Sequence, residues 1–139
     1  MRILISVLLL YLSFNGLGQE LPPDPKLIKS IYFGGGSYYI DNGQYNELKK
    51  FIDSFSNIEN YTITIHSHTD NIGSPDYNQM LSEMRSYMSL LKLVELKVPE
   101  AIISIHDFSE FNPIYDNSTH QGRIRNRRVD IILWPINTL

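Results

Sequence analysis

One short stretch of the chain constrains the fold more than any other, because its hydrophobic period changes from that of a strand to that of a helix. From Tyr61 to His68, large apolar side chains alternate with threonine and histidine, which predicts a strand with one buried face. After Ser74, apolar side chains recur at helical spacing, which predicts a long helix over 75–96 that ends before Pro99. A strand followed at once by a helix indicates a layered fold of both elements.

The same patterns place the remaining elements of one domain. Strands are predicted over 31–33, 101–106 and 129–134, helices over 42–56 and 121–127, and irregular structure over 108–119. The order is β-α-β-α-β-(α)-β, so we expect an α+β two-layer sandwich with a mixed sheet and the helices on one face. A chain with 42% hydrophobic and 19% charged residues can bury a core of its own, which excludes a disordered chain.

The first eighteen residues have the layout of a secretory signal peptide. Arg2 supplies a positive charge, an almost wholly apolar run extends from Ile3 to Phe14, and Gly16 and Gly18 are small residues suited to cleavage. An apolar helix of this length spans roughly 18 Å, well short of the ~30 Å hydrocarbon core of a bilayer. We therefore expect cleavage after residue 18, with an uncleaved anchor as the alternative.

Composition and charge narrow the expected environment of the mature chain. Residues 19–30 contain three prolines and are expected to form a short extended leader before a domain over 31–136. The chain has no cysteine, so we expect neither disulfides nor a lipid anchor, and no membrane-spanning segment in the mature protein. With 15 acidic and 12 basic residues, affinity for nucleic acid is not expected.

A polar turn between the predicted strand and the long helix is the best candidate for a ligand site. Asp70 lies in this turn, and Asn78 and Arg85 follow on the helix, seven residues apart and therefore on one side of it. An aspartate and a guanidinium near each other can bind the ammonium and the carboxylate of one zwitterion. The spacing alone is equally compatible with an Asp70–Arg85 ion pair that only holds the turn against the helix.

Three blocks of sequence, in order and well spaced, resemble one known family. They read HTDNIG at 68–73, YNQMLSEMR at 77–85 and GRIRNRRVDI at 122–131. Together they resemble the OmpA-like peptidoglycan-binding domain, which also occurs in outer-membrane protein A, peptidoglycan-associated lipoproteins and flagellar stator proteins. The resemblance spans about residues 31–134, nearly the whole chain after the signal segment.

The resemblance implies a mixed sandwich without catalysis or cofactor that binds peptidoglycan non-covalently through the diaminopimelate residue of its stem peptides. Carried over by position, Asp70 meets the ammonium group of that residue and Arg85 meets its carboxylate. Thr69, Asn78 and Arg127 match positions that add hydrogen bonds around the ligand. We therefore expect a protein of the periplasm, held at the cell wall or outer membrane, with peptidoglycan as its partner.

Two segments depart from the family pattern and leave a second function open. Gly34–Gly36 stands where relatives often carry polar side chains near the ligand, and His106–Glu110 replaces a glycine-rich turn after the third strand. The alternative is a periplasmic adaptor that uses the same fold to contact a periplasmic or outer-membrane protein and does not bind the wall.

Other clusters of reactive side chains are better explained without new chemistry. His66 and His68, with His106 or Asp70, have ligand types suited to zinc, but histidines on the polar face of a strand are more often solvated or hydrogen-bonded. We therefore expect no metal.

The remaining patterns favour neither nucleic-acid binding nor catalysis. Four arginines lie between residues 123 and 128, but in an exported acidic chain they are expected to be solvated or to contact the wall. The chain has no cysteine nucleophile, Gly-x-Ser-x-Gly or HExxH motif, so we expect no enzyme. A hydrolase that pairs Asp70 with Asp107 or Glu110 is compatible with the spacing, but nothing favours it.

Overall fold

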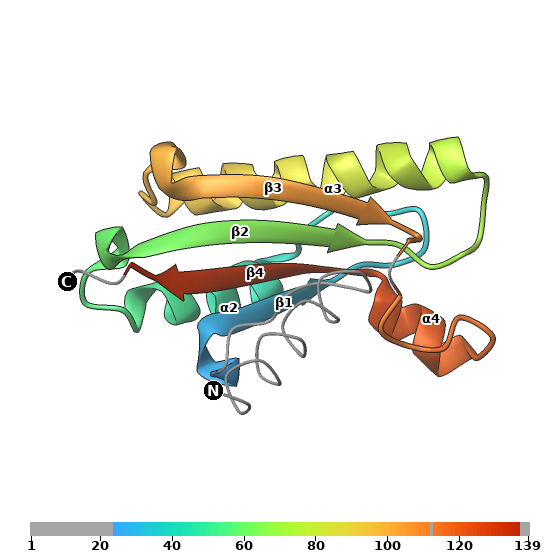
Figure 1. Cartoon of the computed structure of the whole chain (residues 1–139), viewed down its shortest axis with the longest axis horizontal. Coiled ribbons are helices and arrows are strands. Elements are labelled where there is room, and N and C mark those ends of the chain that lie inside the picture. Colours follow the sequence, from blue (N-terminus) through green and yellow to red (C-terminus); the bar gives the residue numbers. More distant parts are fainter. Residues whose placement is uncertain (1–23, 112, 137–139) are drawn as a thin grey trace, which may run out of the picture.

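A computed structural model describes residues 24–111 and 113–136, which form a four-stranded sheet with two helices against one face (Figure 1). The strands are β1 (Ile28–Tyr32), β2 (Tyr61–His68), β3 (Ile103–Ser109) and β4 (Arg128–Pro135). The helices are α2 (Asn42–Asp53), α3 (Pro75–Glu95) and α4 (His120–Asn126), and 3-10 turns occupy Pro25–Leu27, Ile58–Asn60 and Glu100–Ile102. The predicted signal segment, residues 1–18, lies outside the described residues.

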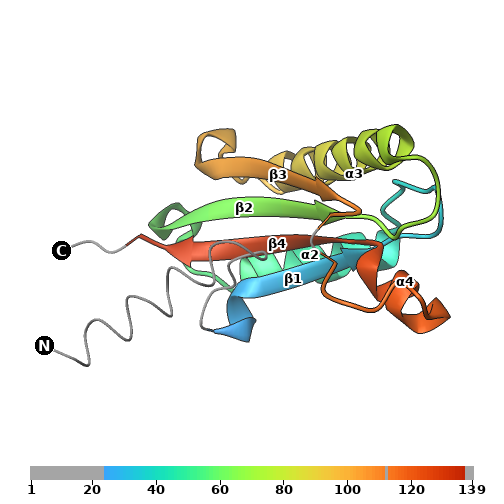
Figure 2. The ribbon, with the colours of Figure 1, turned by 45° about the vertical axis from the view of Figure 1, so that its right-hand side comes forward.

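The sheet is mixed, with strand order β1-β4-β2-β3. β2 runs parallel to β3 and antiparallel to β4, and β4 is antiparallel to β1. Helix α3 packs against β2 and β3, whereas α2 packs against β1, so that both helices cover the same face (Figure 2). The predicted α+β class, the order of the elements and the mixed sheet are confirmed.

The core lies between this face of the sheet and the two helices. Ile63 and Ile65 of β2 are fully buried, opposite Leu133 and Ile131 of β4, and they meet Leu48 of α2. Burying a side chain of this kind stabilises the fold by about 1.5–3 kcal/mol. The alternation read between Tyr61 and His68 therefore identifies the packed face of β2 correctly.

The other face of the sheet is more buried than a polar strand face would suggest. His66 and His68 are only 6% and 2% exposed, and their rings lie 5.3 and 5.2 Å from the ring of Phe108. Arg128 and Asp130 of β4 are also buried here and form an ion pair. Of the two environments expected for these histidines, solvated or hydrogen-bonded, burial excludes the solvated one, because aromatic and charged side chains of neighbouring strands cover them.

Three predicted boundaries are also wrong. β1 begins at Ile28, inside the segment expected to be an extended leader, because pairing with β4 extends it toward the N-terminus from the short apolar run. β3 continues to Ser109 instead of ending at His106, since its partner β2 pairs as far as His68. Helix α2 ends at Asp53, before the predicted end at residue 56.

Candidate functional site

The turn after β2 is held by its own hydrogen bonds. The Asp70 carboxylate accepts the amide of Ile72 at 3.0 Å, and the Thr69 hydroxyl donates to the Asp70 carbonyl at 3.0 Å. The amide of Thr69 donates to the carbonyl of Ser109 at 2.8 Å, which ties the turn to the end of β3. Gly73 has φ +101°, and a Cβ there would lie 2.9 Å from the Tyr77 ring, so the turn requires glycine.

Helix α3 begins directly after this turn and presents polar side chains to it. Ser74 caps the helix by accepting the amide of Tyr77, and Pro75 occupies its first turn. Asn78 is 1% exposed, and its amide group donates to the Asp70 carbonyl at 3.4 Å and to the Glu110 carboxylate at 2.8 Å. The first turns of the helix are thereby joined to the end of β3 as well as to the turn.

Arg85 lies two turns further along α3 and is completely buried. Its guanidinium donates to the carbonyls of Ser37 at 2.8 Å, His68 at 3.2 Å and Gly34 at 3.1 Å, and it lies 5.0 Å from the centre of the Phe33 ring. Burial lowers the pKa of Arg85 to about 10, with nearby Asp70 acting in the opposite direction. The group therefore remains a cation at neutral pH.

The ion partner of Asp70 is Arg127, at the C-terminal cap of α4. The two side chains approach to 3.3 Å, and Arg127 also donates to the carbonyl of Phe33 at 3.2 Å. The alternative of an Asp70–Arg85 pair holding the turn is therefore wrong, because backbone carbonyls satisfy Arg85. Arg127, with 18% of its side chain exposed, is the more exposed of the two cations in the pocket.

All five residues predicted for ligand binding line one pocket of about 320 Å³. They are Thr69, Asp70, Asn78, Arg85 and Arg127. The rest of the lining consists of Gly35, Gly36, Ile72, Gly73, Tyr77 and Leu81. The structure thus brings together side chains from a turn, from helix α3 and from the C-terminal cap of α4 with the backbone of the glycine loop, while the role of each in binding stays a prediction.

Two contributors to this site were predicted only in part. The glycine loop was expected near the ligand with backbone contacts only, and it takes part through the carbonyls of Gly34 and Ser37, which bind Arg85. Glu110 binds Asn78 from the end of β3, and the altered segment His106–Glu110 was the only signal that could have indicated it. Ser109, just before it, has φ +55°, a left-handed conformation in which glycine is favoured.

The chemistry available in this pocket is recognition of charge. It holds one carboxylate and two guanidinium groups, with amide and hydroxyl groups between them. In the described part of the chain, no group of three or more His, Asp or Glu side chains is placed to hold a metal ion. Over the same residues, no helix is long and apolar enough to cross a membrane.

One protein family matches most of the chain. A model described as the OmpA family matches residues 32–127, which include the turn, helix α3 and Arg127. The chain therefore belongs to the OmpA family, as the three sequence blocks predicted.

Particular relatives are identical to this chain at about a third of the aligned positions. Outer-membrane lipoprotein YfiB of Pseudomonas aeruginosa is 32% identical over 103 residues, which cover 74% of this chain and 61% of YfiB. Peptidoglycan-binding protein ArfA of Mycobacterium tuberculosis is 32% identical over 103 residues, which cover 74% of this chain and 32% of ArfA. The chain thus spans less than two thirds of the length of these relatives.

Solved structures agree on the fold. The peptidoglycan-associated lipoprotein of Burkholderia pseudomallei superposes with a TM-score of 0.66 at 22% identity, covering 76% of this chain and 90% of that one. The C-terminal domain of Helicobacter pylori MotB superposes with a TM-score of 0.67 at 20% identity, covering 78% and 85%.

Proposed function

We propose that this protein binds cell-wall peptidoglycan through the pocket at the end of β2 and is retained in the bacterial envelope by that contact. The observation that carries the proposal is the convergence of Asp70, Arg85 and Arg127 on one pocket. Membership of the OmpA family supports it, since the relative ArfA is described as peptidoglycan-binding. The charged and polar groups that line the pocket are suited to recognition of a charged ligand, which supports a binding function.

The ligand group that fits best is the diaminopimelate residue of the stem peptide, whose side chain ends in an ammonium and a carboxylate. Asp70 accepts from the ammonium, while Arg127 and then Arg85 donate to the carboxylate. Within the described chain, three of the five N–H groups of Arg85 are already bonded, which leaves two for a ligand. Each hydrogen bond to a charged group contributes about 1.5–3 kcal/mol when desolvated.

Co-sedimentation with purified sacculi tests the proposal. Asp70→Asn and Arg127→Gln should leave the protein in the supernatant under conditions in which the parent sediments, and free diaminopimelate should release the parent. Arg125→Gln, on the exposed side of α4, and Asp53→Asn, at the exposed end of α2, are matched controls that should sediment normally. Normal sedimentation of folded Asp70→Asn would contradict the assignment.

A second function, a periplasmic adaptor that contacts another protein, is favoured by one observation. Carbonyls of the loop Gly34–Ser37 already occupy Arg85, and Glu110 already occupies Asn78, so part of the pocket is satisfied internally. An adaptor should form a stable complex with an envelope protein that survives Asp70→Asn, and should not sediment with sacculi.

A further inference from the structure

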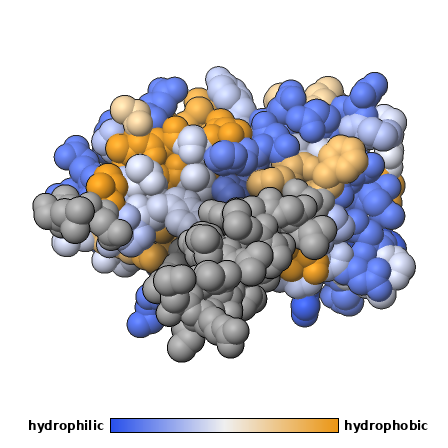
Figure 3. Space-filling view, viewed as in Figure 1, coloured by the Kyte–Doolittle hydropathy of each residue, from blue (hydrophilic) through white to orange (hydrophobic). Residues whose placement is uncertain are grey.

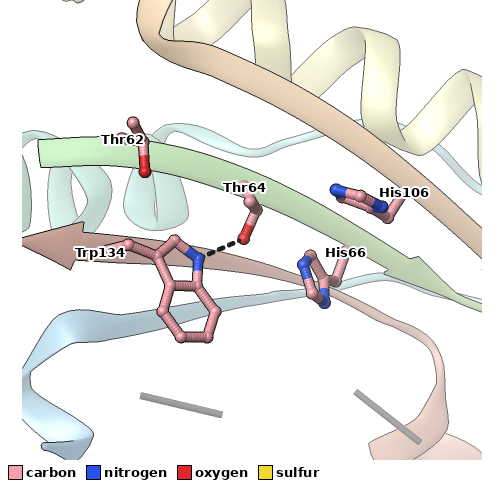
Figure 4. A pocket seen from close by; sticks show the side chains of 5 residues that line it. All are labelled: Thr62, Thr64, His66, His106 and Trp134. Carbon is pink, nitrogen blue, oxygen red and sulfur yellow. Dashed lines mark hydrogen bonds between the residues drawn. The ribbon is translucent and has the colours of Figure 1, made fainter. Parts of the chain in front are cut away.

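A second pocket, of about 380 Å³, lies on the face of the sheet that the helices leave open. Five side chains from three adjacent strands line it, and Figure 4 shows them. They are Thr62, Thr64 and His66 of β2, His106 of β3 and Trp134 of β4. None of them belongs to the pocket that contains Asp70.

The indole of Trp134 is held in place by its neighbours on β2. Its Nε1 donates to the hydroxyl of Thr64 at 2.8 Å, drawn as the dashed line in Figure 4, and its backbone lies opposite Thr62 in the strand register. The Thr64 oxygen accepts this bond, so its own hydrogen is available to another acceptor. The pocket therefore has a fixed aromatic wall with two hydroxyl groups beside it.

The other wall consists of two imidazoles from β2 and β3. The rings of His66 and His106 lie 5.1 Å apart, and His66 is 6% exposed. Within the described chain, Nδ1 of His66 has no hydrogen-bond partner. A buried polar atom left without a partner costs about 1–3 kcal/mol. Because this nitrogen is buried, the exposed ring of His106 is the imidazole that is more accessible to a ligand hydroxyl.

The lining carries no carboxylate, ammonium or guanidinium group among the residues that the structure describes. Burial, together with the neighbouring His106, lowers the pKa of His66 to about 4, so this imidazole is neutral at the pH of the envelope. On the visible described surface of this face, Figure 3 shows pale residues beside an orange apolar area and blue hydrophilic residues toward the middle. A charged ligand would find no partner here.

We infer that this open-face pocket binds a neutral saccharide, with one face of a pyranose ring on the Trp134 indole and its hydroxyls bonded to Thr62, Thr64 and the two histidines. A pyranose has a face of C–H groups, which suits the electron-rich face of an aromatic ring, and an edge of hydroxyls. A fixed aromatic wall with convergent neutral donors and acceptors has the same two-sided character. The site goes beyond the proposed stem-peptide pocket and does not depend on it.

The chain contains a single tryptophan, so intrinsic fluorescence reports this pocket directly. Titration of the purified protein with an oligomer of N-acetylglucosamine, and separately with a glucose oligomer, should give a saturable change in Trp134 emission with at least one of them. The stronger response distinguishes an amino-sugar glycan, as in the wall, from other polysaccharides. No saturable change with either, or binding only of an acidic saccharide such as a glucuronate oligomer, would overturn the inference.

Two variants locate the binding without disturbing the fold, because His106 and Thr62 are exposed. His106→Ala and Thr62→Val should weaken saccharide binding by about tenfold, whereas Asp70→Asn should leave it unchanged. If Asp70→Asn abolished the response and the other two did not, the saccharide would occupy the pocket at the end of β2 and the inference would be wrong.

Discussion

The two pockets of this protein lie at different parts of the same sheet and differ in the chemistry of their lining side chains. The pocket at the end of β2 contains Asp70, Arg85 and Arg127, whereas the pocket in the middle of the open face is lined by neutral side chains. The charged groups of the first are contributed by a turn and two helices, and the second is built from neighbouring strand positions alone.

The two pockets differ in how many free backbone groups are available to form hydrogen bonds with buried charges. Turns and helix ends provide free backbone groups, and Arg85 and Arg127 use the carbonyls of Gly34, Ser37 and Phe33 in this way. In the middle of the sheet, backbone groups are consumed by strand pairing, so the buried charges of Arg128 and Asp130 are satisfied by each other, and the pocket lining beside them is neutral. We therefore expect substitutions at the charged pocket to affect stability strongly, and substitutions on the rim of the neutral pocket to affect it little.

Arg85→Ala should have the largest effect. It leaves the carbonyls of Gly34, Ser37 and His68 without their buried donor and opens a cavity, so the free energy of unfolding should fall by about 3–5 kcal/mol. Urea denaturation followed by circular dichroism measures this. Arg125→Ala, on the exposed side of α4, is the control and should change stability by less than about 0.5 kcal/mol. An equal loss of unfolding free energy in the two variants would contradict the expectation that the charged pocket is important for stability.

Acidification should lower the free energy of unfolding, because it protonates the buried histidines at the neutral pocket. The pKa of His66 is lowered to about 4 and that of His68 to about 3, in both cases mainly by burial. Between pH 6.5 and 4 the unfolded chain therefore binds more protons than the folded one, so stability is full above pH 6.5 and falls as the pH is lowered. For His66 alone the loss amounts to about 3 kcal/mol.

Urea denaturation at pH 7 and at pH 4.5 measures this dependence, and His66→Gln provides the comparison. The variant should lose less stability than the parent over the same interval, because one of the two buried histidines with a lowered pKa is gone. An identical loss in both proteins would show that His66 does not contribute.

Gly73→Ala should have an intermediate effect and should act on the charged pocket alone. The left-handed backbone and the contact of the new Cβ with the Tyr77 ring should cost about 1–3 kcal/mol and displace Asp70. Thermal unfolding measures the first effect, and sacculus sedimentation tests the second. Gly35→Ala is the matched control, since a Cβ there meets nothing within 4 Å and its φ is not left-handed. If folded Gly73→Ala sedimented as the parent does, the conformation of the turn would not be required for binding to sacculi.

His106→Ala should have the smallest effect on stability. The side chain is exposed, and its loss should change the free energy of unfolding by less than about 0.5 kcal/mol while weakening saccharide binding. Chemical denaturation checks the first expectation, in parallel with the fluorescence titration. A large loss of stability would show that the neutral pocket is as tightly integrated as the charged one.

Features set by residues close together in the sequence were predicted most accurately. The strand predicted over 61–68 has the bounds of β2, and the helix predicted over 75–96 differs from α3 by one residue, because periodicity and the Ser74 cap are local signals. The end of β3 was missed because it depends on pairing with a strand more than thirty residues earlier. The burial of His66 and His68 was missed for the same reason, since Phe108 and β4 supply their cover.

The sequence alone indicated the family and the order of the elements, because motifs and periodicity are local. Local spacing pointed to Asp70, Asn78 and Arg85, and the resemblance to the family added Thr69 and Arg127. Only the tertiary structure decided that Asp70 pairs with Arg127, that loop carbonyls enclose Arg85, and that three strands form a neutral pocket around Trp134. Hydrogen-bond partners and burial depend on which remote segments pack together. A pattern along the chain does not show how close in space two remote segments lie.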